Sequence, residues 1–175
     1  MRWLGLITLI AVAAGAAWFG WHRYGPRPSA PVMAPEAARV DHILIEKSAR
    51  RLTASLDGAV VMQVDIALGF APEGDKQVEG DGKTPVGVFK VDRRNPQSAY
   101  HLSLGLDYPQ PDDVTRAQQQ GIDPGGDIFI HGQPNGVVGL TLPGDWTAGC
   151  IAISNTEMAQ LWRLTATGTT VEIRP

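Results

Sequence analysis

The chain has 175 residues, 43% of them hydrophobic and 19% charged, which suits one globular domain with its own core and is too short for two. The formal net charge of −3 excludes a protein that binds nucleic acid through bulk positive charge. A single cysteine excludes an internal disulfide framework and a cysteine-rich zinc module, and it makes that thiol a candidate reactive group.

The N-terminal segment, residues 1–24, is strongly apolar. Residues 3–21 contain no charged side chain, and as a helix rising ~1.5 Å per residue they would cross the hydrocarbon layer of a bilayer. Aromatic residues gather at the end of this run and arginines follow it, as at a membrane interface. We predict a membrane anchor here, with a cleavable signal peptide, cut after the small residues 14–16, as the alternative.

Residues 25–39 are rich in proline. Four prolines occur within a dozen positions, namely Pro26, Pro28, Pro31 and Pro35. Proline at this density favours an extended tether that does not fold by itself. The predicted globular domain therefore occupies residues 40–175.

The remaining pattern predicts a mainly β domain with short helices. Strands are expected at 42–47, 51–56, 59–68, 87–91, 100–104, 128–131 and 170–173. Helices are expected at 112–120, where Gly121 would end the helix, and at 155–164. The Asp57-Gly58 pair is typical of a tight hairpin turn, because both positions tolerate positive φ. Ser154 and Glu157 have the spacing of a capping box at the start of the second helix, and Gly168 is its expected end.

Two kinds of binding site are not expected. The segment Gly82-Lys83-Thr84 is similar to the end of a phosphate-binding loop, but Gln77 stands where the first glycine of that loop belongs. Pro85 also prevents a helix from starting at Thr84. The four histidines lack metal-ligand spacing, so we predict no metal site, and the chemistry proposed below needs no cofactor.

A histidine and the lone cysteine form the strongest candidate site. His131 ends an apolar strand-like run and precedes Gly132, and Cys150 follows Gly149 nineteen positions further on. An isolated cysteine is usually a small buried side chain, but with a strand-end histidine it is typical of a nucleophile and its base. The imidazole would take the thiol proton, and backbone N–H groups at 149–150 would hold the oxyanion formed from an amide carbonyl.

These residues resemble a known signature. His131-Gly132, a spacer, and then Thr147-x-Gly149-Cys150 followed by a hydrophobic residue are similar to the motif of L,D-transpeptidases with a YkuD-type catalytic domain. Residues 84–89, TPVGVF, also look like the family's T-P-x-G-x-F segment. The resemblance covers most of residues 41–175 and implies an L,D-transpeptidase-like β-sandwich catalytic domain behind the N-terminal anchor.

The resemblance also implies roles for individual residues. Cys150 would be the nucleophile and His131 the general base. Gly132 would orient the imidazole through its backbone carbonyl, and Thr147 and Gly149 would shape the acyl pocket.

Two positions depart from the usual pattern. Ala148 stands where many members have histidine, giving T-A-G-C in place of S-H-G-C, and Ala152 stands where many have arginine. The chain is similar to a branch of the family that includes hydrolases which detach proteins from the wall. The alanines therefore bear on the acceptor and the exact reaction more than on the nucleophile.

The implied function is a peptidoglycan L,D-transpeptidase that acts on stem peptides through a thioester acyl-enzyme, in biogenesis or remodelling of the cell wall. The alternatives are an amide hydrolase, either an L,D-carboxypeptidase or an enzyme that releases a wall-linked protein, and a catalytically silent wall-binding module. Peptidoglycan lies outside the cytoplasmic membrane, so the domain is expected on the periplasmic side. Residues 108–125 are either a lid over a peptide cleft or a solvated connector.

Overall fold

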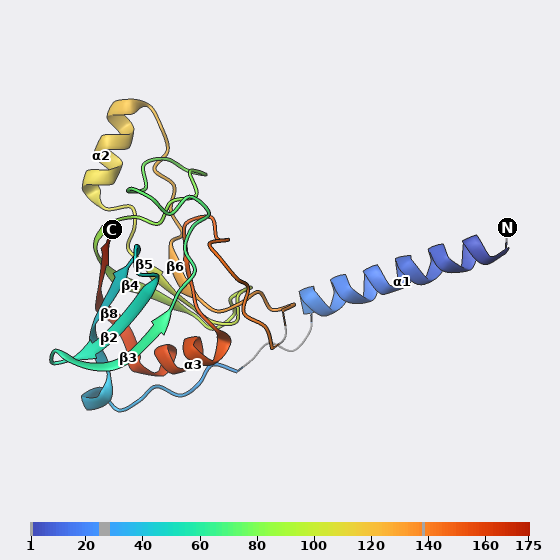
Figure 1. The fold of residues 1–175 in the computed structure, drawn as a ribbon, viewed down its shortest axis with the longest axis horizontal. Coiled ribbons are helices and arrows are strands. Elements are labelled where there is room, and N and C mark those ends of the chain that lie inside the picture. Colours follow the sequence, from blue (N-terminus) through green and yellow to red (C-terminus); the bar gives the residue numbers. More distant parts are fainter. Residues whose placement is uncertain (1, 25–28, 138) are drawn as a thin grey trace.

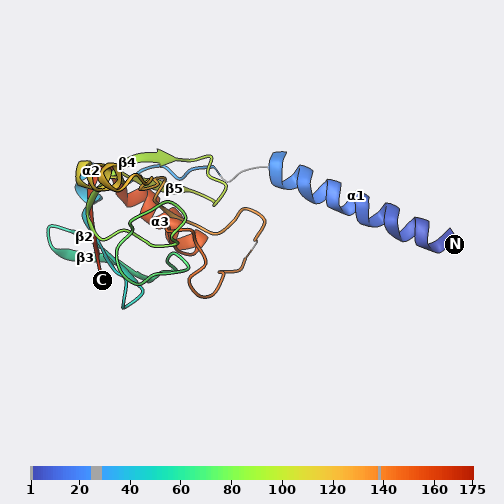
Figure 2. The same cartoon turned by 90° about the horizontal axis from the view of Figure 1, so that it is seen from above.

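The structure is a computed structural model that describes residues 2–24, 29–137 and 139–175. Helix α1 (Arg2–Tyr24) extends away from the folded domain in both views (Figures 1 and 2). In the part of the chain described, no helix combines the length and the apolar character that a membrane crossing requires. The anchor predicted for residues 3–21 is therefore not confirmed.

The segment before the first strand lies along the domain. The Ala34 N–H donates to the Arg163 carbonyl at 2.8 Å, and the Ala34 side chain is buried. A short 3₁₀ turn, Glu36–Ala38, then leads into the sheet. Much of the proline-rich segment is thus fixed to the domain, whereas positions 25–28 lie outside the described residues.

The domain is built on one eight-stranded sheet with the strand order β3-β2-β1-β8-β4-β5-β6-β7. Strands β1 and β8 are parallel, as are β6 and β7, and the other neighbouring pairs are antiparallel. The strands are β1 (Val40–Glu46), β2 (Arg51–Leu56), β3 (Ala59–Asp65), β4 (Gly87–Asn95), β5 (Ser103–Leu106), β6 (Phe129–His131), β7 (Ile151–Ala152) and β8 (Thr165–Arg174).

The sheet curls until its two ends meet. Strand β4 pairs with β8 through its first half and with β5 through its second half. At the far edge, Ala67 and Ala152 exchange two backbone hydrogen bonds of 2.8 Å. The predicted mainly β domain with short helices is confirmed, and its strands form a single curled sheet. The sheet can curl because β4 is long enough to belong to both halves and the chain after β3 covers the β7 edge.

Local turn and capping signals in the sequence are confirmed. Asp57 and Gly58 adopt φ values of 51° and 78°, as the hairpin between β2 and β3 requires. Helix α3 (Asn155–Leu164) begins with the expected capping box, in which Ser154 and Glu157 bond each other's backbone N–H. Helix α2 (Pro111–Gln120) ends at Gly121, which has a φ of 66°.

The strand ends were predicted less well. The strand expected at 100–104 begins at Ser103 instead, because His101 has a φ of 64° and turns the chain. The two-residue strand β7 was not predicted at all. Gly168 does not end α3, since β8 starts at Thr165, directly after the helix, and Gly168 lies within that strand.

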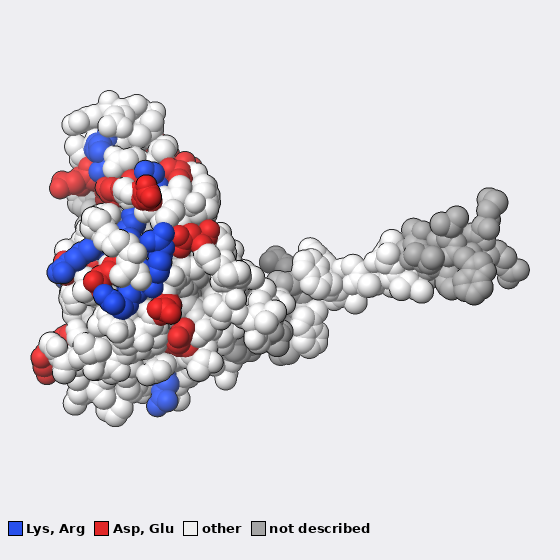
Figure 3. All heavy atoms as spheres, in the orientation of Figure 1, with Lys and Arg blue, Asp and Glu red and all other residues white. Residues whose placement is uncertain are grey.

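The core lies inside the curled sheet and is closed by α3. Helix α3 buries Met158, Leu161 and Trp162. The fully buried side chains of the sheet are almost all branched aliphatics, including Ile43, Ile45, Leu52, Leu104, Leu106, Ile130 and Ile151. On the face shown in Figure 3, acidic and basic side chains are interspersed over the domain, and the described part of α1 shows neither.

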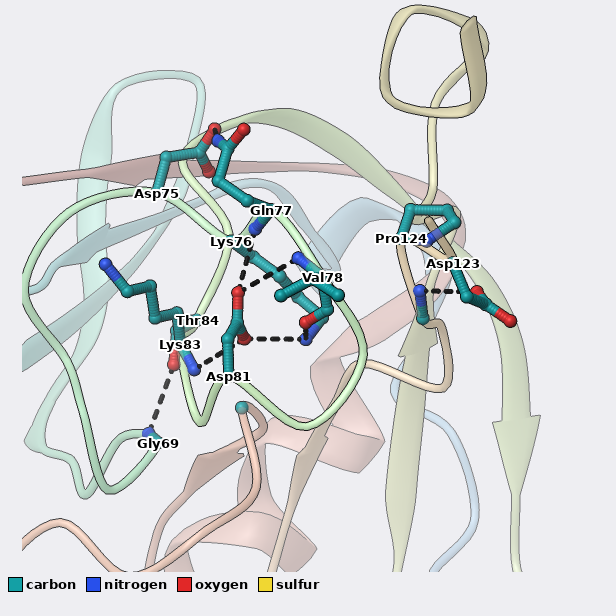
Figure 4. Close-up of polar contacts among 12 residues, drawn as sticks. Gly69, Asp75, Lys76, Gln77, Val78, Asp81, Lys83, Thr84, Asp123 and Pro124 are labelled. Carbon is teal, nitrogen blue, oxygen red and sulfur yellow. Dashed lines mark hydrogen bonds and ion pairs between the residues drawn. The ribbon is translucent and has the colours of Figure 1, made fainter. Parts of the chain in front are cut away.

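The loop between β3 and β4 is organised around one carboxylate (Figure 4). Asp81 accepts hydrogen bonds from the backbone N–H groups of Gln77, Val78 and Lys83 at 2.8–3.2 Å. It also pairs with the buried ammonium of Lys76 at 2.9 Å. Burial by itself would raise the pKa of Asp81, but these hydrogen bonds lower it to about 2.

A second buried lysine ties this loop to the sheet. Lys47, which follows β1, donates to the carbonyl of Thr84 at 2.7 Å and to the carbonyl of Gly74. Burial lowers the pKa of its ammonium, against the attraction of Asp75. The Lys47 ammonium thus holds both ends of the segment from Gly74 to Thr84.

This loop makes the stability of the domain sensitive to acid. The pKa of Asp81 is 3.8 for the free group and about 2 in the fold, so the carboxylate contributes about 2 kcal/mol above pH 4. That contribution should be lost as the pH falls from about 4 through about 2. Asp81→Asn should remove this part of the pH dependence and lower the free energy of unfolding by roughly 3 kcal/mol at neutral pH, since Lys76 stays buried without its partner.

The measurement is urea denaturation at several pH values. Glu79→Gln, which changes an exposed carboxylate of the same loop, is the control and should behave as wild type. An Asp81→Asn variant that retains the wild-type acid profile would contradict the prediction.

Candidate active site

His131, the last residue of β6, is buried with its ring held on several sides. Its Nδ1 lies 2.7 Å from the carbonyl oxygen of Gly132. The rings of Tyr100 and Trp146 lie against it, with centroids 4.6 Å and 5.7 Å from that of the imidazole. Because a carbonyl oxygen only accepts, Nδ1 carries the proton in the neutral ring and Nε2 is free to act as a base.

Cys150 lies beside this histidine because β6 and β7 are parallel neighbours. His131 is paired with Ala152, and side chains alternate along a strand, so Cys150 lies on the same side of the pair as the imidazole. The Cys150 thiol donates to the carbonyl oxygen of Asp127 with an Sγ–O distance of 3.4 Å.

Both side chains line one cavity of about 490 Å³. Its walls are mostly aromatic and small polar side chains, in keeping with a peptide-sized site. The lining residues are Asn95, Ser98, Ala99, Tyr100, Ser103, Asp127, Phe129, His131, Trp146, Thr147, Ala148 and Cys150.

Thr147 holds the turn that carries the nucleophile candidate. Its buried hydroxyl donates to the Cys150 carbonyl at 2.7 Å and accepts from the Gly149 N–H at 3.1 Å. Its own backbone pairs with Leu68 and Phe70, on the segment that follows β3. The Gly149 N–H is thus engaged within the turn, which leaves the Cys150 N–H as the donor better suited to an oxyanion.

Two glycines of the motif occupy positions without room for a side chain. A Cβ on Gly149 would lie 2.7 Å from the Lys83 carbonyl oxygen, and Gly149 has a φ of 134°. A Cβ on Gly132 would lie 2.5 Å from Oδ1 of Asn155. The turn of Cys150 therefore rests directly on the loop organised by Asp81.

An ion pair fixes the start of the same turn. Asp145 accepts from Arg50 at 3.0 and 2.8 Å and from the Leu68 N–H at 2.9 Å. Arg50 itself has a φ of 50° in the turn between β1 and β2. This ion pair connects the turn between β1 and β2 to Asp145. The next residue, Trp146, lines the cavity.

The electrostatic surroundings keep both groups neutral at rest. Burial raises the pKa of the Cys150 thiol, and the nearby Asp127 carboxylate raises it further, against the hydrogen bond from the Phe129 backbone. Burial lowers the pKa of His131, against its hydrogen bond with Gly132. The resting site therefore holds a thiol beside a neutral imidazole rather than an ion pair.

The other predicted residues are placed as follows. Ala148 is exposed and lines the cavity, whereas Ala152 is buried and lines a different hollow. None of the described residues 108–125 lines the cavity around Cys150, and Arg116 of α2 instead donates to the Lys76 carbonyl on the neighbouring loop.

Asp127 and Tyr100 also line the cavity, although no role was predicted for either of them. Asp127 directly precedes the strand expected at 128–131, but its contact with the Cys150 thiol comes from a distant part of the chain.

The model of the L,D-transpeptidase catalytic domain matches residues 40–173. The chain belongs to the L,D-transpeptidase catalytic-domain family. No curated protein matches this L,D-transpeptidase domain.

Solved structures show the same fold. The helical cell shape determining protein Pgp2 from Campylobacter jejuni is 27% identical with a TM-score of 0.59, over 91% of this chain and 54% of that one. Bd1075 from Bdellovibrio bacteriovorus is 22% identical with a TM-score of 0.57, over 83% and 51%. An L,D-transpeptidase from Xylanimonas cellulosilytica is 19% identical with a TM-score of 0.51, over 86% and 65%.

The chain thus spans 51–65% of the length of these three proteins. The two less similar ones establish the L,D-transpeptidase fold alone.

The contact between Gly149 and the Lys83 carbonyl gives a test of the turn. Gly149→Ala should lower the free energy of unfolding by about 2 kcal/mol or more and slow alkylation of Cys150 by iodoacetamide, because the turn must move. Gly144→Ala is the matched control: Gly144 also has positive φ, at 70°, but has open space around it.

Thermal unfolding and intact-mass kinetics measure the two effects. Equal alkylation rates in the two variants would show that the close approach to Lys83 does not position the thiol.

Proposed function

We propose that this chain is a peptidoglycan L,D-transpeptidase with Cys150 as nucleophile and His131 as general base. The observation that supports it best is their common cavity, in which His131 Nδ1 is held 2.7 Å from the Gly132 carbonyl oxygen. This geometry favours an enzyme over a silent wall-binding module, because binding alone would not need an oriented imidazole beside a thiol.

In the first step, Sγ attacks the carbonyl carbon of the L-centre in a stem tetrapeptide while Nε2 of His131 takes the thiol proton. The oxyanion is held by the Cys150 N–H, since the Gly149 N–H is already bonded to Thr147. The C–N bond then breaks, the imidazolium gives its proton to the leaving amine of the terminal D-residue, and a thioester remains.

In the second step, an amine or water attacks the thioester. His131 takes the proton of the attacking group, the C–S bond breaks and the thiol is regenerated. An amine acceptor gives a cross-link, and water gives a trimmed peptide or, on an existing linkage, release of a wall-bound protein. The cell-shape role in the name of the Campylobacter protein supports a place in wall remodelling.

The proposed chemistry predicts a covalent adduct. The full-length chain incubated with a carbapenem should gain the mass of one ligand on Cys150. Cys150→Ala should gain none, and His131→Ala should react roughly a hundredfold more slowly. His42→Ala, which removes a β1 histidine paired with Glu172, should react at the wild-type rate.

Intact-mass spectrometry over time gives all four rates. A wild-type chain that stays folded and forms no adduct would contradict the assignment of Cys150 as nucleophile. If the adduct forms, product analysis with a stem tetrapeptide, with and without an amine acceptor, then separates transfer from hydrolysis.

We also propose that α1 anchors the domain on the periplasmic side, where peptidoglycan lies. The support is the uncharged run of residues 3–21. A reporter that is active only in the cytoplasm, fused after Pro175, should give no signal, and a strong signal would overturn this placement.

A further inference from the structure

One charged side chain lines the catalytic cavity. Among the described residues of its walls, Asp127 carries a formal charge at neutral pH, whereas burial lowers the pKa of His131 and keeps that ring neutral. The other polar groups are hydroxyls, amides and ring atoms. The Asp127 carboxylate is therefore the negative group that the cavity wall offers to a substrate.

Asp127 lies next to the reacting atom. Its backbone carbonyl accepts the Cys150 thiol at 3.4 Å, so its side chain branches from the residue in contact with the sulfur. Its φ of 54° is uncommon for a residue with a side chain.

The carboxylate is held in place but not covered. Arg93 binds Oδ1 at 2.8 Å, and its guanidinium also bonds Asp92 at 2.8 Å and stacks on Phe129, 4.5 Å from the ring centroid. The Asp127 side chain is nevertheless 87% exposed. Among the described residues its charged partner is Arg93, at one oxygen, so Oδ2 remains for a ligand.

We infer that Asp127 is a specificity-determining residue that binds an ammonium group of the acyl donor, close to the scissile amide. This inference rests on the proposed function, because it assigns the acyl group to the same cavity. A donor with a free amine at this place is favoured, and one that is neutral or anionic there is disfavoured. Arg93 acts as a positioning residue that aims the carboxylate.

The test compares two peptides that differ in one charge. They are stem tetrapeptides with lysine or with side-chain-acetylated lysine as the residue that supplies the scissile carbonyl. Each is added to the full-length chain, and its apparent Kd is taken from how far it slows carbapenem adduct formation on Cys150. This readout works whether or not the peptide is turned over.

The wild type should bind the lysine peptide about fivefold more tightly than the acetylated one, the size expected for an exposed ion pair. Asp127→Asn should bind the two peptides equally. Asp92→Asn, which removes the other carboxylate partner of Arg93, should keep the preference. Raising the salt concentration should shrink the wild-type preference, because exposed charges are screened.

Several outcomes would overturn the inference. A preference that persists in Asp127→Asn, equal binding of both peptides by wild type, or no protection by either peptide would each do so. Because the carbapenem adduct is measured in the same experiment, these results leave the nucleophile standing. Failure of wild type to form the adduct would overturn the proposed function as well.

Discussion

The cavity that holds His131 and Cys150 depends on the pairing of the chain after β3 with the edge of β7. Strand β7 has two residues and is too short to be stable by itself. It is held between β6 on one side and the two Ala67–Ala152 hydrogen bonds on the other. This closure also pairs the backbone of Thr147 with that of Leu68 and Phe70. These hydrogen bonds fix the turn before β7, and with it the position of Cys150 relative to His131.

Charged groups outside the cavity support the position of Cys150. Three charged groups organise the loop between β3 and β4: the Asp81 carboxylate and the ammonium groups of Lys47 and Lys76. The Lys83 carbonyl of this loop lies against Gly149. These groups are costly to bury and are stable there because several hydrogen bonds satisfy each one. The polar loop thus supports the turn that carries Cys150, and the aromatic rings of Tyr100 and Trp146 hold the His131 imidazole.

Local signals were predictable because they act over a few residues. The Asp57-Gly58 turn, the capping box at Ser154 and the end of α2 at Gly121 each follow from short-range backbone chemistry. The His131 and Cys150 candidates were visible as a motif. Asp127 and β7 were not predicted, because their roles come from contacts between distant parts of the chain. The curled sheet was missed for the same reason, since only pairing shows that β4 serves both halves.

The packing of Ala34 on α3 limits how far the domain can travel from α1. The chain between Tyr24 and Ala34 spans ten residue steps, and at full extension these reach about 35 Å. If α1 lies in a membrane, as proposed, the cavity works within a thin layer next to that surface. The protein would then select its substrates by their distance from the membrane as well as by their chemistry.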